Sequence, residues 1–172
     1  MSTPVIRANL GALTIVAMLA LLPAAAQPPA TGRPAAAPTG NEMTPPYGPP
    51  ITLAQAEKVI AKARAAAAQL GSDVNVIAVV DTHGELVAFI RMDAATLHSV
   101  AYAQEKARGA ARLRRVTATP PPEMAAALTA MPDFVSMPGG IPIVHNGRTI
   151  GAVGVSGGHD AEIAAAAAGA LD

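Results

Sequence analysis

The chain contains no cysteine, no tryptophan and little charge of either sign. The lack of cysteine excludes disulfides, thiolate metal sites, iron–sulfur clusters and cysteine nucleophiles. Two Tyr and two Phe are too few to build a stacking platform for single-stranded nucleic acid. The 12 basic residues equal the 12 acidic ones, which argues against an electrostatic nucleic-acid binder. A hydrophobic fraction of 51% instead indicates a folded chain.

The N-terminus has the pattern of a secretory signal peptide over residues 1–26. Arg7 precedes an apolar run of 13 residues from Leu10 to Leu22, and Pro23 and an Ala-Ala-Ala cleavage site follow it. The run is shorter than the roughly 20 apolar residues that a membrane span needs. We therefore expect cleavage after Ala26, export to a periplasm or the cell exterior, and a mature chain without a membrane span.

Residues 27–50 form a predicted linker, since eight of these 24 residues are Pro and three are Gly. Proline removes backbone donors and favours extended conformations, so we expect a semi-rigid, solvated spacer.

Residues 51–172 have the length of one domain. Periodicity and turn signals predict two hairpins interleaved with helices, which implies an α+β fold with helices packed on an antiparallel sheet. The Asp81 to Gly84 turn and the Asn146-Gly147 pair would close the hairpins. The expected helices are 52–70, 94–115, 123–131 and 160–171, and the expected strands are 74–80, 86–91, 141–145 and 148–156.

The helix expected at 94–115 carries two different stripes. One is small and apolar and would let the helix approach a sheet closely, while the other carries polar and aromatic groups. The apolar stripe is Val100, Ala103, Ala107 and Ala110, and the second stripe is His98, Tyr102, Glu105, Gly109 and Arg112. A histidine beside an apolar pocket can ligate haem iron, and of the four His we rank His98 and His159 first as metal ligands.

Residues 154–158 match the G-x-S-x-G pattern of a nucleophile elbow around Ser156. We reject a serine hydrolase because the one downstream histidine, His159, is too close in sequence to assemble a triad. Two interpretations remain open. The amides of Gly157 and Gly158 could bind a carboxylate, a haem propionate or a phosphate where a helix begins. Alternatively, the glycines of this strand only permit close packing between strand and helix.

Taken together, several segments resemble the GlcG/HbpS-like family, also called haem-degrading domains. The resemblance covers essentially all of residues 51–172. It is carried by Val79 to Asp81 with Gly84 and Leu86, by Arg91 to Asp93 with Ala95, by Ser99, Ala101, Lys106 and Ala107, by Pro138 to Ile143, and by Ile150 to Gly158.

The resemblance implies a profilin-like α+β fold, with an antiparallel sheet of about five strands flanked by helices on both sides. It also implies homo-oligomers, binding of haem or a corrinoid, and roles in haem sensing or degradation or in glycolate and diol utilisation. Some members ligate iron through a His of the first helix. Residues 52–70 contain no His, so that mode cannot operate here. Other members use a hydroxyl or another weak ligand, and for that mode a Thr or Tyr would have to serve.

We therefore expect an exported haem-binding protein that acts in haem sensing, storage or degradation, with the porphyrin in an apolar cleft and its propionates near Arg112, Arg114 or Arg115. Whether it is an enzyme stays open, and no catalytic residue is assigned. The alternative is an accessory module without catalysis that binds a small hydroxy acid or a corrinoid. The candidate cofactor-binding residues are His98, Tyr102, Arg112, Ser156, Gly157, Gly158 and His159, with His98 and His159 as the candidate metal ligands.

Overall fold

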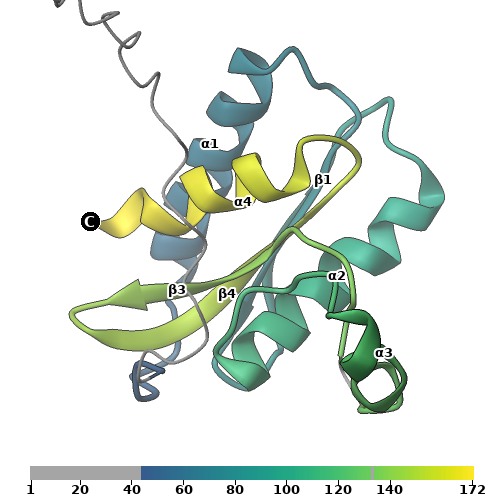
Figure 1. Cartoon of the computed structure of the whole chain (residues 1–172). Helices are drawn as coiled ribbons and strands as arrows, with labels where there is room; N and C mark the ends of the chain where they lie inside the picture. Colours follow the sequence, from purple (N-terminus) through teal and green to yellow (C-terminus); the bar gives the residue numbers. More distant parts are fainter. Residues whose placement is uncertain (1–43, 133) are drawn as a thin grey trace, which may run out of the picture. The chain divides into compact units, whose positions relative to one another are not determined.

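The computed structural model describes residues 44–132 and 134–172, which fold into an antiparallel sheet with helices on both faces (Figure 1). Within these residues the sheet has four strands in the order β2-β1-β4-β3, close to the expected five. The elements are α1 (Leu53–Gln69), β1 (Val76–Asp81), β2 (Leu86–Arg91), α2 (Leu97–Leu113), α3 (Pro122–Thr129), β3 (Gly140–His145), β4 (Arg148–Ser156), α4 (Asp160–Ala168) and a 3-10 turn (Gly169–Leu171). The predicted α+β architecture is confirmed.

Both predicted hairpin turns are present. The carboxylate of Asp81 accepts the backbone amides of His83 at 2.8 Å and Glu85 at 3.0 Å, and Gly84 takes a φ of +88°. Asn146 and Gly147 have φ values of +52° and +70°, the left-handed pair that a two-residue hairpin loop requires. These turns join β1 to β2 and β3 to β4 in antiparallel pairs.

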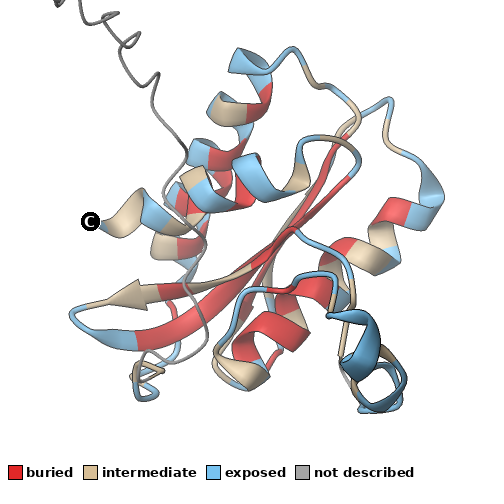
Figure 2. Ribbon diagram, in the orientation of Figure 1, coloured by how far each residue is buried: buried red, intermediate tan, exposed pale blue. Residues whose placement is uncertain are grey.

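The central strands are buried on both faces, which explains their nearly continuous apolar sequence. On one face, Ile77 and Val153 pack with α1 and α4. On the other, Val76 and Ala152 pack against α2. Figure 2 shows the resulting buried residues running along the strands and the inner sides of the helices.

The small apolar stripe of α2 packs on the sheet as predicted. Ala103, Ala107 and Ala110 are fully buried, and the helix backbone lies directly over Gly154 of β4. A Cβ at Gly154 would overlap the Ala103 carbonyl and lie 2.6 Å from the Ala107 amide nitrogen. This close approach requires glycine and supports the packing interpretation of the β4 glycines.

Helix boundaries differ from the predictions by a few residues. Thr52 and Gln55 form the capping box expected for α1. For α2, the side chain of Thr96 accepts the Ser99 amide and starts the helix three residues later than predicted. The expected cap of α4 is wrong, because His159 is the N-cap with a φ of +53° and Asp160 is the first helical residue. The side chain of Asp160 is instead taken up by Lys106.

The last part of the predicted linker is attached to the domain. Tyr47 forms a parallel bridge with Thr149, and its hydroxyl donates to the Arg112 carbonyl at 2.7 Å. The guanidinium of Arg114 lies 4.6 Å from the centre of the Tyr47 ring. The predicted signal peptide and linker residues 27–43 lie outside the described residues. In the part of the chain that the structure describes, every helix is too short or too polar to cross a membrane.

Candidate functional site

The outer face of α2 brings two of the predicted site residues together. His98 and Tyr102 lie one helical turn apart, and their ring centres are 4.1 Å from each other with the planes tilted by 47°. His98 is exposed and Tyr102 is half-buried, while Ser99 between them faces the interior. This pair therefore presents an imidazole and a phenol, two groups that can ligate haem iron, at the protein surface.

A groove of about 350 Å³ lies on α2 next to this pair. Glu105 and Arg108 line it from the helix, and Phe134 and Val135 line it from the segment that follows α3. Glu105 is three residues after Tyr102, so the groove continues the same helix face. The side chain of Arg108 also donates from Nε to the Gly84 carbonyl at 3.3 Å. An acidic, a basic and two apolar side chains thus share one concave surface.

The segment around α3 adds exposed apolar surface close in sequence to this groove. None of the residues of α3 is buried, as Figure 2 shows. Met124, Met131 and Met137 are 49%, 46% and 41% exposed. Methionine adapts its shape to irregular apolar partners, and exposed apolar side chains gathered in one segment indicate a binding surface.

Arg112 lies far from His98 on the same helix. Fourteen residues separate them, which is about 21 Å along an α-helix. The Nε of Arg112 donates to the His83 carbonyl in the β1–β2 turn at 3.3 Å, and Arg114 donates to the Pro45 carbonyl at 3.1 Å. These two side chains contact the hairpin turn and the residues before α1. The arginine that lines the groove is Arg108, which sequence reasoning did not select.

The glycine-rich loop between β4 and α4 holds the remaining candidates. Ser156 is only 6% exposed, and Gly157 has a φ of +144°. A Cβ at Gly157 would overlap the Val74 carbonyl, and the Gly158 carbonyl accepts a hydrogen bond from the Asn75 side chain at 2.7 Å. Close packing accounts for the glycine at 157, whereas a Cβ at Gly158 would meet only ordinary contacts at 3.6 Å. His159 is exposed beside it.

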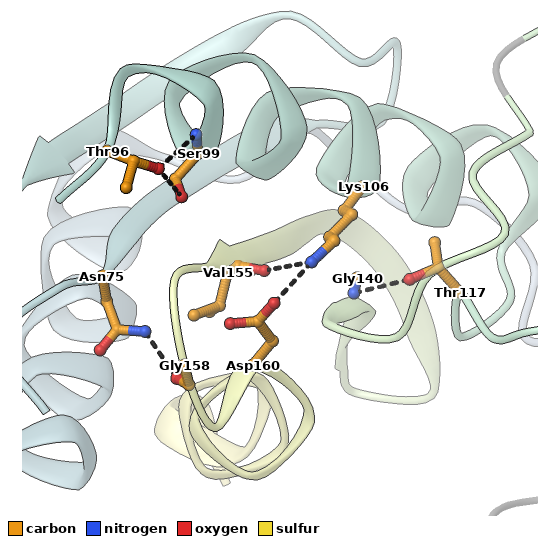
Figure 3. A network of polar contacts seen from close by, with 9 residues as sticks. All are labelled: Asn75, Thr96, Ser99, Lys106, Thr117, Gly140, Val155, Gly158 and Asp160. Atoms are coloured by element: carbon orange, nitrogen blue, oxygen red, sulfur yellow. Dashed lines mark hydrogen bonds and ion pairs between the residues drawn. The ribbon is translucent and has the colours of Figure 1, made fainter.

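A buried ion pair ties this loop to α2 (Figure 3). The Lys106 ammonium is fully buried and donates to Asp160 Oδ2 at 2.7 Å and to the Val155 carbonyl at 3.0 Å. Asp160 Oδ1 is buried without a hydrogen-bond partner. The first turn of α4 therefore already holds a carboxylate of the chain itself, that of Asp160. One of the two interpretations from the sequence placed an external anion there. Sequence reasoning missed the pair, although a lysine within the alanine stripe of α2 is a visible signal.

Metal-ligating side chains do not cluster among the described residues, where no group of three or more His, Asp or Glu could hold a bare metal ion. His83 is exposed in its turn, as expected, and His145 ends β3. Haem iron, in contrast, needs only one or two ligands from the protein.

A second groove, of about 410 Å³, lies between α1 and the edge strand β2. Ala88 and Ile90 of β2 line one side, and Leu53, Glu57 and Arg64 of α1 are among the residues on the other side. It contains none of the predicted site residues.

Comparison with known proteins gives consistent results. Residues 51–172 match the family model described as "Haem degrading protein HbpS-like". Protein GlcG of Escherichia coli K12 is 43% identical over 83 residues, which cover 46% of this chain and 62% of GlcG. The chain thus matches less than two thirds of that relative's length.

Solved structures show the same fold. A double mutant of HbpS from Streptomyces reticuli is 31% identical, with a TM-score of 0.65, and the match covers 81% of this chain and 99% of that one. A PduOC structure, described as a complex with haem, is 27% identical with a TM-score of 0.60, covering 72% and 96% of the two chains.

Proposed function

Because the chain belongs to the HbpS-like family of haem degrading proteins, we propose that it binds haem on the outer face of α2. The observation that carries this assignment is the His98–Tyr102 pair, whose tilted rings are in contact on α2, followed one helical turn later by the groove lined by Arg108 and Phe134. A relative of the same fold is described as a haem complex, which supports the choice of ligand.

The residues present fit the chemistry of haem. The groove offers the apolar side chains of Phe134 and Val135 to a porphyrin face, and Arg108 offers a positive charge to a propionate, which would have to lie on the side of Arg108 away from the Glu105 carboxylate. His98 or Tyr102 would ligate the iron. α1 contains no histidine, so a His of the first helix cannot ligate the iron in this chain. A ligand from α2 would take that role. The iron, when bound, supplies redox and ligand-binding chemistry at this surface.

The test is a titration of the purified full chain with hemin, followed by the Soret band. We expect saturable binding, a shifted band in His98→Ala and Tyr102→Phe, and a loss of affinity of about ten-fold or more in the double variant. His83→Ala is the matched control, because His83 is an exposed histidine that does not line the groove. A wild-type chain without a saturable Soret change would refute the proposal.

His159 is the competing ligand, since it is exposed at the start of α4. If His159→Ala alone changed the spectrum, the haem would lie over the β4–α4 loop instead.

Thermal-shift measurements with small hydroxy acids and with a corrinoid test the accessory-module alternative, because a ligand that binds the folded state raises the melting temperature. The Lys106–Asp160 pair counts against a small anion at the start of α4, because the Asp160 carboxylate already lies there.

Haem degradation is the second candidate, favoured by the description of the family model. The haem-loaded chain would be incubated with ascorbate or peroxide. Loss of the Soret band together with chelatable iron and a bilin product would support enzymatic breakdown, whereas bleaching without these products would leave binding alone.

Export is part of the proposal and has its own test. The full chain expressed with its N-terminus should appear in the periplasm or medium as a shorter form that starts at Gln27. Retention of an intact chain in the cytoplasm would contradict it.

A further inference from the structure

The chain between α2 and β3 leaves the domain and returns to it at the same point. Where it leaves, the Thr117 amide donates to the Gly140 carbonyl at 2.9 Å. Where it returns, the Gly140 amide donates to the Thr117 hydroxyl at 2.8 Å, and both residues are buried (Figure 3). These two bonds hold the ends together, so residues 118–138 form an excursion with a closed base.

The base of the excursion is packed into the domain. Gly139 has a φ of +117°, and its carbonyl accepts the amide of Val155 at the end of β4 at 2.8 Å. A Cβ at Gly140 would overlap the Lys106 carbonyl of α2. Because the backbone fits this closely between α2 and β4, the base keeps its place when the rest of the excursion moves.

The body of the excursion is held far less firmly. No described residue from Ala118 to Pro138 is buried, and α3 lies within this stretch (Figure 2). Its half-buried side chains include Phe134 and Val135, which line the groove together with side chains of α2. Segments with few buried apolar contacts open locally at a low cost in free energy. A packed base and an unpacked body are the features of a flap that turns about its base.

Proline limits how the body can move. Pro120, Pro121 and Pro122 lead into α3, and Pro132 and Pro138 lie before and after the residues that line the groove. Each proline fixes its own φ and favours extended conformations for the residue before it. The body therefore changes its contact with α2 more readily than its internal shape.

We propose that residues 118–138, here called the α2–β3 flap, open and close over the groove on α2, and that Thr117 is the positioning residue for the closed flap. The inference rests on the proposed function, since this groove is the site assigned to haem. The flap carries Phe134 and Val135, so a ligand enters when the flap lifts and is retained when it closes.

The size of the groove supports this movement. Its volume of about 350 Å³ is near the lower limit of ligand pockets, which span roughly 300–1,000 Å³. A ligand as large as a tetrapyrrole therefore requires the flap to move outwards.

Thr117 acts on the groove through Gly140. The described residues that line the groove do not include Thr117. Thr117→Val keeps the shape of the side chain but removes the acceptor of the buried Gly140 amide. The base then loosens, and the open flap gains population. Thr117→Ser retains the hydroxyl and should retain the closed flap.

The first experiment measures the position of the flap without haem. Because the chain has no cysteine, two introduced cysteines carry spin labels, and double electron–electron resonance gives the distribution of distances between them. Ala126→Cys with Glu162→Cys joins exposed sites on the flap and on α4. The matched control is Lys62→Cys with Glu162→Cys, on helices α1 and α4, which share one core.

We expect the flap pair to give a broader or two-peaked distribution compared with the control pair. Thr117→Val should increase the open population, and Thr117→Ser should resemble the wild type. Circular dichroism checks that both variants fold. If Thr117→Val does not fold, the wild-type distribution with and without hemin decides.

The second experiment adds hemin to the same labelled proteins. Hemin should narrow the distribution of the flap pair and leave the control pair unchanged. In stopped-flow measurements, Thr117→Val should release hemin about five-fold faster than the wild type, because changes at a binding site act mostly on dissociation. Thr117→Ser should release it at the wild-type rate.

The two proposals fail in different ways. The flap is overturned by a flap pair as narrow as the control pair, by a distribution that a folded Thr117→Val leaves unchanged, or by one that bound hemin leaves unchanged. A broad distribution that responds to Thr117→Val, in a chain that binds no hemin, refutes the haem assignment and supports the flap.

Discussion

The Lys106–Asp160 pair places a fully buried ammonium between three segments, α2, the end of β4 and the start of α4. Removing one partner of such a pair strands the other charge, which typically costs about 3–5 kcal/mol. We predict that Lys106→Met lowers the free energy of unfolding by about 3 kcal/mol in urea titrations. Lys62→Met, at an exposed position of α1, is the control and should change little.

The double variant Lys106→Met with Asp160→Leu separates charge from packing. It should recover much of the lost stability, because a buried pair exchanged for apolar groups is often neutral. A double variant no better than Lys106→Met alone would show that the lost hydrogen bond to the Val155 carbonyl, and not the stranded carboxylate, causes the destabilisation.

Gly154 tests the close approach of α2 to the sheet. Gly154→Ala drives a Cβ into the backbone of α2, and neither partner can move without distorting an element. We expect a loss of about 2–3 kcal/mol, in the range of overpacked cores. Gly169→Ala, whose Cβ would meet its nearest atom at 3.4 Å, should be nearly neutral in the same thermal denaturation series.

At the residue scale, the sequence predicts what depends on near neighbours. The Asp81 turn, the Asn146-Gly147 turn and the Thr52 capping box follow from chemistry within four residues, and all three are confirmed. The pairing of Lys106 with Asp160 joins residues 54 positions apart. Its partner therefore cannot be read from local pattern, and the capping role expected for Asp160 is wrong.

At the scale of the elements, α3 is set apart because it buries none of its residues. Helices normally gain their stability from a buried apolar face, so its apolar side chains are available to a ligand. We predict that Met124→Ser in α3 and Met131→Ser just after it change the stability by less than about 0.5 kcal/mol while weakening hemin binding. Met92→Ser, which removes a side chain packed against the core, should lower stability instead.

The helices and strands themselves were predictable because period and turn signals mark them, and both stripes of α2 could be read from spacing. The groove beside α2 could not be, since it needs Phe134 and Val135 to meet a helix that lies more than twenty residues earlier. For the same reason the sequence suggested Arg112 as a cofactor-binding residue, whereas the arginine that lines the groove in the structure is Arg108. Spacing on one helix identifies a face but not what the rest of the chain brings against it.

At the scale of the whole domain, both edges of the sheet carry a feature that hinders the addition of another strand. On β3, Pro142 has no amide to donate, and the Gly140 amide already donates to Thr117. On β2, the pairing with β1 shifts between Val79 and Val80, so that Val87 is an extra residue in the strand. We therefore expect ligands to bind the helix faces of the domain, of which the outer face of α2 carries the proposed haem site.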